Sequence, residues 1–181
     1  MCDDDERQIL AEGRHIHLVR RRGWEYAERP GTTGIVAILA ITDENQLILV
    51  EQYREPLRKP VIELPAGLAD DVHGGEAEAL ATAAQRELLE ETGYQAEELV
   101  YLTEGPPSAG LSDEVITFFR ATSLRKVGDG GGVGRESIKV HEVPLADAAS
   151  WLQGAAARGL LVDPKVYTGL YFAGQTPSPM V

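Results

Sequence analysis

The sequence predicts an α+β fold in which a mixed β-sheet lies between helices. The first observation is that apolar segments of strand length and longer segments of helical periodicity are mixed along the chain. The second is that these two kinds of segment do not alternate strictly, as they would in a doubly wound parallel sheet. The third is composition: the chain has 181 residues, of which 43% are hydrophobic and 25% charged, as is typical of one soluble globular domain.

The N-terminal part of the chain is expected to be rich in strands. The first dozen residues are polar and predict a tail. Residues 15–31 alternate apolar and polar side chains, which predicts two short strands that turn at Gly23. Residues 34–41 are almost all apolar and often β-branched, so they predict a strand buried on both faces. Residues 46–54 then predict the returning strand, and residues 61–67 a short strand that ends in a turn.

The second half of the chain carries the predicted helices. Residues 74–93 are rich in Ala, Leu and Glu and end at Gly93, which supplies a left-handed stop. Asp163 is the expected N-cap of the last helix, because Pro164 suits the first helical position. The remaining predicted elements are strands at residues 114–122 and 137–143 and helices at residues 145–159 and 163–174.

Charge and cysteine content exclude several classes of function. A formal net charge of −12 makes the chain a poor general binder of nucleic acid or of an anionic membrane. No stretch reaches the roughly 18 apolar residues that span a bilayer. The single cysteine, Cys2, rules out an internal disulfide and a cysteine-rich zinc site, and it fits a cytoplasmic location. An anionic substrate would therefore need local positive charge, and a divalent cation is the obvious source.

Three glutamates of the predicted helix, Glu87, Glu90 and Glu91, fall within about 100° of arc on a helical wheel. Like charges at these spacings destabilise an isolated helix by a few tenths of a kcal/mol each. One interpretation is a solvated acidic face that is eased by a contact between Arg86 and Glu90. The other is a site for a hard divalent cation such as Mg²⁺, which prefers oxygen ligands. The acids continue the apolar face of the helix, which favours the cation site.

The segment RELLEETGY resembles the second half of the Nudix box, whose pattern is G-x5-E-x7-R-E-U-x-E-E-x-G-U, with U a bulky apolar residue. Residues 86–94 fit this pattern, and Glu78 lies at the required spacing before Arg86. The opening glycine departs from it. Strict counting places that glycine at Val72, but Gly67 in ELPAGLADD is the better candidate. We infer an insertion of five residues in the loop before the helix.

The resemblance implies a Nudix α/β/α sandwich that hydrolyses nucleoside diphosphates linked to another group, with Mg²⁺ as cofactor and Mn²⁺ as its substitute. It implies that Glu87 and Glu91 are direct metal ligands and that the Ala66 carbonyl completes a metal shell. Glu90 would be a further ligand or would act through a metal-bound water. The residues with structural roles in the motif would be Gly67, Glu78, Arg86 and Gly93.

The flanking segments WEYAERPGTTGIVAILAI, LILVEQYREP, IELPAGLADD and GPPSAGLSDEVITFF resemble the ADP-ribose pyrophosphatase branch of this family, over about His15 to Phe172. This implies cleavage of ADP-ribose to AMP and ribose 5-phosphate, and a homodimer that shares an added N-terminal β segment over residues 1–33. The hydrolase domain would cover residues 34–174, followed by a tail at 175–181. The alternatives are another substrate (GDP-mannose, NADH or a dinucleoside polyphosphate) and a regulatory domain that binds ADP-ribose without turnover.

Further site residues follow from the same branch. Trp24 offers an aromatic face to adenine, with packing in the core or the dimer interface as the alternative. Arg54 is a candidate phosphate ligand or else a surface arginine. Glu114 would contact the substrate or support the metal shell, or simply begin a strand. The branch takes its catalytic base from a late loop, where Glu136 in GDGGGVGRESIKV is our candidate base or additional metal ligand, and Asp129 the reserve. The alternative is that this glycine-rich loop is merely loose.

Overall fold

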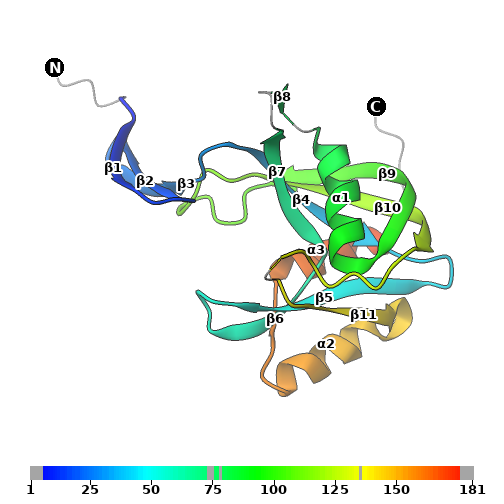
Figure 1. The fold of residues 1–181 in the computed structure, drawn as a ribbon. Helices are drawn as coiled ribbons and strands as arrows, with labels where there is room; N and C mark the ends of the chain where they lie inside the picture. The colour runs from blue at the N-terminus through cyan, green and yellow to red at the C-terminus, as the bar shows by residue number, and fades with distance from the viewer. Residues whose placement is uncertain (1–5, 73–75, 78, 135, 176–181) are drawn as a thin grey trace.

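The computed structural model describes residues 6–72, 76–77, 79–134 and 136–175. Two β-sheets lie against each other in the centre of the molecule. One helix covers the outer face of the first sheet and another helix covers the second sheet (Figure 1). A small sheet of N-terminal strands projects to one side. The predicted α/β/α sandwich with an added N-terminal β segment is confirmed, although two packed sheets replace the single mixed sheet that we expected.

The first sheet has the strand order β8-β7-β4-β10-β9 and is mixed, because β4 runs parallel to β10 and antiparallel to β7. Residues 36–40 of β4 are completely buried, as the apolar segment predicted. Alternate residues of this strand enter the two cores of the molecule, so both faces are covered. The strands are β4 (Thr32–Ala40), β7 (Ala66–Val72), β8 (Glu76–Ala77), β9 (Tyr94–Gly105) and β10 (Ile116–Lys126).

The second sheet has the order β11-β5-β6-β12 and corrects one expectation. The strand β5 does not return beside β4; a single bridge between Ile41 and Leu47 links the two. Instead, Leu47 and Leu49 of β5 share a core cluster with Leu39 of β4, so the two apolar strands stack face to face. The strands are β5 (Gln46–Arg54), β6 (Lys59–Glu63), β11 (Ile138–Pro144) and β12 (Leu161–Val162).

Three α-helices complete the described part of the chain. The helix α1 (Leu80–Thr92) packs on the first sheet through Ala83, Ala84 and Leu88. It ends at Gly93 as predicted, but it begins six residues later than residue 74, and β8 occupies part of the predicted helix. The helix α2 (Ala148–Ala157) follows a 3₁₀ turn (Leu145–Asp147) and covers the second sheet. None of the described helices is long and apolar enough to cross a membrane.

The N-terminal sheet has the order β1-β2-β3, formed by β1 (Gln8–Glu12), β2 (His17–Arg21) and β3 (Trp24–Glu28). Positive φ angles of 49° at Arg22 and 79° at Gly23 make the tight turn that the sequence predicted. The strand β1 lies where a polar tail was expected. It is held by pairing with β2 and by an ion pair in which Arg7 Nε lies 2.9 Å from Glu28 Oε2.

The helix α3 (Pro164–Ala173) has the predicted cap: Lys165 N–H donates to Asp163 Oδ1 at 2.7 Å. Replacing Asp163 by Ala removes this acceptor, so we expect the free energy of unfolding to fall by about 1 kcal/mol in urea denaturation. Asp163→Asn keeps an acceptor oxygen and should retain most of the stability. Equal losses in the two variants would contradict a capping role.

Candidate functional site

The helix α1 turns Glu91 inward against β7. Glu91 is 5% exposed, and its Oε2 accepts a hydrogen bond from the Ala66 N–H at 3.0 Å. Burial raises the pKa of Glu91 to about 8, the Ala66 hydrogen bond opposes the shift, and the negative charges of Glu87 and Glu136 add to it. A solvated acidic face does not describe a carboxylate in this environment.

Arg86 ties α1 to β7 and to two of the glutamates. Its Nη1 lies 2.8 Å from Glu87 Oε1 and 3.3 Å from Glu90 Oε2, and its Nη2 donates to the Leu68 carbonyl at 2.9 Å. Burial raises the pKa of Glu87, and the ion pair with Arg86 opposes that shift. These contacts are what a bracing role of Arg86 requires. The proposed brace from Glu78 lies outside the described residues.

Gly67 is a point of close approach between β7 and α1. A Cβ built on Gly67 would lie 1.9 Å from Cδ of Glu87 and 2.1 Å from its Oε1. Any side chain at this position would therefore occupy the space of the Glu87 carboxylate. The absence of a side chain here is what allows Glu87 to extend over the strand.

A cavity of about 500 Å³ opens between α1, β7 and the segment that follows β10. Ala66 and Gly67 form part of its wall. Its charged lining residues are the acids Glu87, Glu91, Glu114 and Glu136 and the cations Arg29, Arg54 and Lys165. The structure thus places four predicted acids together with Arg54 in one cavity.

Each cation of this cavity contacts a carboxylate. Arg54 forms a forked ion pair with Glu63, with Nε 3.1 Å from Oε1, and Gln52 Nε2 donates to the same carboxylate at 3.1 Å. Lys165 Nζ lies 2.5 Å from Asp163 Oδ2. These partners fix the positions of the cations and leave them on the wall of the cavity.

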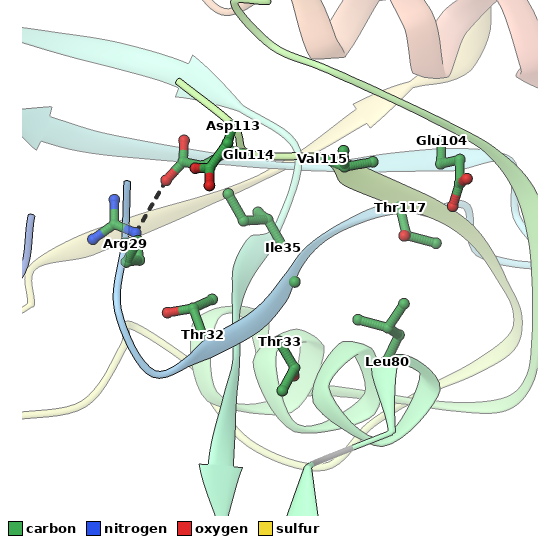
Figure 2. A pocket seen from close by; sticks show the side chains of 11 residues that line it. Arg29, Thr32, Thr33, Ile35, Leu80, Glu104, Asp113, Glu114, Val115 and Thr117 are labelled. Carbon is green, nitrogen blue, oxygen red and sulfur yellow. Dashed lines mark hydrogen bonds and ion pairs between the residues drawn. The ribbon is translucent and has the colours of Figure 1, made fainter. Parts of the chain in front are cut away.

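A second, smaller cavity of about 300 Å³ adjoins the first, because Arg29, Ile35 and Glu114 line both. Figure 2 shows the ion pair between Arg29 and Glu114, whose Nε and Oε1 atoms lie 3.0 Å apart. Hydroxyl and carboxyl groups surround the remaining space, contributed by Thr32, Thr33, Glu104, Asp113 and Thr117. The two cavities together offer a polar surface that is larger than the acid cluster alone.

Sequence reasoning missed two cations of the site, Arg29 and Lys165. Arg29 precedes Pro30 at the end of β3, and Lys165 follows Pro164 in the first turn of α3. Neither residue belongs to a sequence motif that indicates a catalytic or binding role. Their role on the cavity wall results from the way distant segments pack.

Trp24 lies outside the acid-lined cavity. Its side chain on β3 is 66% exposed and lines a shallow hollow together with Tyr26 and Asp113. Asp113 also lines the smaller cavity of Figure 2, so the hollow borders the site. Contact between Trp24 and a nucleobase stays a prediction.

The donor set of the acid-lined cavity fits a divalent cation. Glu87, Glu91 and Glu136 come from α1 and from the segment before β11, and hard carboxylate oxygens are the ligands that Mg²⁺ prefers. Within the described ranges, however, no three or more His, Cys, Asp or Glu side chains form a group that could hold a metal ion as they are placed. Each of the three acids instead meets a different N–H group, from Arg86, Ala66 and Val133. Glu90 is paired with Arg86 and is absent from the described lining of the cavity.

Comparisons with known proteins show which family this chain resembles. A family profile described as the NUDIX domain matches residues 31–161. The methanol dehydrogenase activator of Bacillus methanolicus is 37% identical over 121 residues, which cover 66% of this chain and 63% of that protein. The ADP-ribose pyrophosphatase of Bacillus subtilis (strain 168) is 40% identical over 116 residues, which cover 64% of this chain and 60% of that protein. This chain thus spans less than two thirds of the length of these two relatives.

The fold has a counterpart among solved structures. The crystal structure of an ADP compounds hydrolase superposes with a TM-score of 0.64 and covers 82% of this chain and 80% of the other. The two sequences are 23% identical, so the likeness concerns the fold.

Proposed function

Because the chain belongs to the Nudix family, we propose that it hydrolyses the diphosphate bond of a nucleoside diphosphate sugar. ADP-ribose, cleaved to AMP and ribose 5-phosphate, is the foremost substrate, and 40% identity to an ADP-ribose pyrophosphatase supports this choice. The observation that carries the proposal is the cavity in which Glu87, Glu91 and Glu136 face three cations.

Glu87, Glu91 and Glu136 are the proposed ligands of Mg²⁺, with Mn²⁺ as a substitute, and the Ala66 carbonyl completes the shell. When bound, such an ion lowers the pKa of water and polarises a phosphoryl oxygen. Glu90 is a further candidate for the same shell or for a contact through water. Glu136 is also the proposed general base, which takes the proton of the attacking water.

The cations of the wall are proposed to hold the diphosphate. Arg54 and Lys165 are each oriented by a carboxylate partner, so they meet an anionic ligand without first losing side-chain freedom. The fork of Arg54 suits phosphate oxygens. Glu114 and the hydroxyl groups of the adjoining cavity would contact the sugar part of the substrate (Figure 2).

We also propose a cytoplasmic homodimer in which residues 1–33 are the shared element and residues 34–174 the hydrolase domain. The exposed Trp24 on the projecting sheet supports a shared element, because aromatic side chains are enriched in the interfaces between protein subunits. The oligomeric state is measurable by light scattering with and without residues 1–33.

The decisive test is a comparison of turnover on ADP-ribose, GDP-mannose, NADH and diadenosine polyphosphates with Mg²⁺ or Mn²⁺. We expect the highest kcat/KM for ADP-ribose and no turnover after metal removal with EDTA. A higher kcat/KM for GDP-mannose or another compound would overturn the choice of substrate. Binding of ADP-ribose without turnover would instead support the regulatory domain.

Replacing Gly67 by Ala should separate activity from stability. The added Cβ collides with the end of the flexible Glu87 side chain, which can rotate away, so we expect unfolding free energy to change by less than about 1 kcal/mol. The rotation displaces a proposed metal ligand, and turnover should fall about 10–100-fold. Gly154→Ala in α2 is the matched control, since its Cβ meets only an ordinary contact at 3.5 Å with Arg158. Turnover at the wild-type level in folded Gly67→Ala would contradict the role of Glu87.

A further inference from the structure

The glycine-rich segment that follows β10 is attached to the C-terminal end of α1. Figure 1 shows this segment, drawn between β10 and β11, passing the end of the helix. Gly131 N–H donates to the Glu91 carbonyl at 2.9 Å, and Gly132 N–H donates to the Glu90 carbonyl at 3.0 Å. Val127 N–H donates to the Gly93 carbonyl at 2.8 Å. The last carbonyls of a helix lack partners within the helix, and here the segment supplies them.

Close packing accompanies these hydrogen bonds. A Cβ built on Gly130 would lie 2.4 Å from the carbonyl carbon of Thr92 and 2.6 Å from the Glu91 oxygen. A Cβ on Gly93 would lie 2.1 Å from the Gly128 oxygen. Both glycines have left-handed φ angles, 68° and 74°. The backbones of helix and segment therefore approach to a distance that only glycine permits.

The attached segment leads directly to Glu136. Ile138 N–H donates to the Gly131 carbonyl at 3.2 Å, which links the described residues on the two sides of position 135. Val133 N–H donates to Glu136 Oε2 at 2.9 Å. A Cβ on Gly132 would lie 2.7 Å from both Cβ and Oε2 of Glu136. Gly132 thus donates a backbone hydrogen bond to α1. The Glu136 side chain lies where a Cβ on Gly132 would need space.

We propose that Gly130, Gly131 and Gly132 are positioning residues that fix Glu136 relative to the carboxylates of α1. The proposal rests on the proposed hydrolase function, in which Glu136 acts in the chemical step. The same two residues, Glu90 and Glu91, provide side chains to the acidic face and carbonyls to the attached loop. We call this attached loop, residues 127–138, the bracket, because it is held on the helix that carries the proposed metal ligands. Its glycines allow the backbones of loop and helix to approach closely; they do not serve to make the loop flexible.

Gly130→Ala is the test, and Gly134→Ala is the matched control. Gly134 has a similar φ of 66°, but a Cβ there meets no described atom within 4 Å, so the control carries the backbone strain without the collision. We expect Gly130→Ala to lower kcat about 10–100-fold with KM within about threefold, and Gly134→Ala to change kcat by less than about threefold. Equal kcat values for the two variants would overturn the proposal.

A double-mutant cycle shows whether the bracket acts through Glu136. In the Glu136→Gln background, Gly130→Ala should lower the remaining turnover by less than about threefold. A full additional loss in that background would show that the bracket serves some other group, and would overturn the assignment.

Amide hydrogen exchange gives a readout that needs no substrate. The Gly131 and Gly132 amides should be protected in the metal-free wild type and in Gly134→Ala, and exposed in Gly130→Ala. Rapid exchange of both amides in the wild type would overturn the bracket whatever the enzyme does. Protected amides in a wild type that turns over no nucleoside diphosphate would overturn the proposed function and the positioning role, while the attachment of the loop would stand.

Discussion

Replacing Glu91 by Gln is expected to lower turnover of ADP-ribose, the proposed substrate, by about 100-fold or more at saturating Mg²⁺, since Glu91 is a proposed metal ligand and a metal ligand contributes several kcal/mol. Gln has nearly the same shape, and its side-chain oxygen still accepts the Ala66 N–H. The fold should therefore remain intact. The exposed Glu98 on β9 supplies the control, and Glu98→Gln should leave kcat unchanged. Wild-type kcat in Glu91→Gln at saturating Mg²⁺ would remove Glu91 from the metal site.

Glu91→Gln is also expected to change the free energy of unfolding when no metal is bound. Burial raises the pKa of Glu91 from 4.5 to about 8 in the folded state, so the folded state favours the protonated form. The stabilisation of the folded state by protonated Glu91 is fully present below the pKa that Glu91 has in the unfolded chain. It is lost as pH rises through the pKa that Glu91 has in the folded state. Gln does not ionise, so the free energy of unfolding of Glu91→Gln should rise relative to that of the wild type by about 5 kcal/mol between about pH 4.5 and about pH 8. Urea denaturation in EDTA measures the difference, and a pH-independent difference would contradict it.

Glu136→Gln is expected to lower kcat about 10²–10⁴-fold, as for removal of a general base. KM should change by less than about threefold, because a general base, the role proposed for Glu136, acts in the chemical step. Gln preserves the acceptor for the Val133 N–H, so the loop keeps its hydrogen bond. If KM alone rises, the loop is a substrate clamp and the base lies elsewhere.

Asp129→Asn is the control for this experiment. Asp129 is exposed on the same segment and is the reserve candidate for the base. Its replacement should leave kcat within about threefold of the wild type. A large loss in Asp129→Asn with normal turnover in Glu136→Gln would exchange the two assignments.

The sequence was most informative where the signal is local. The acids of α1 repeat at helical spacing on an apolar face, and Gly93 ends the helix at the predicted position. The cap at Asp163 likewise depends on neighbours in sequence. Strand partners are different, because pairing joins residues far apart along the chain. No local pattern predicted which sheet contains β5, or that β9 pairs with β10.

The same distinction holds within the site. The Nudix box gave Glu87 and Glu91, which the structure places in one cavity. Arg29 and its partner Glu114 are 85 residues apart, so their pairing depends on the packing of β3 against the segment before β10. Arg54 was predicted from its position after an apolar strand, but its forked contact with Glu63 follows from the pairing of β5 with β6.

The contacts at the start of β7 have a consequence for how this chain tolerates change in length. Glu91 accepts a hydrogen bond from the Ala66 N–H, and Arg86 donates one to the Leu68 carbonyl. These two bonds hold α1 on β7 independently of the residues that connect them. We therefore expect the longer connection inferred from the family pattern to leave the carboxylates in place. Residues 73–75, which connect β7 to β8, are accordingly the place to insert a reporter or a tether, and such an insertion should leave turnover unchanged.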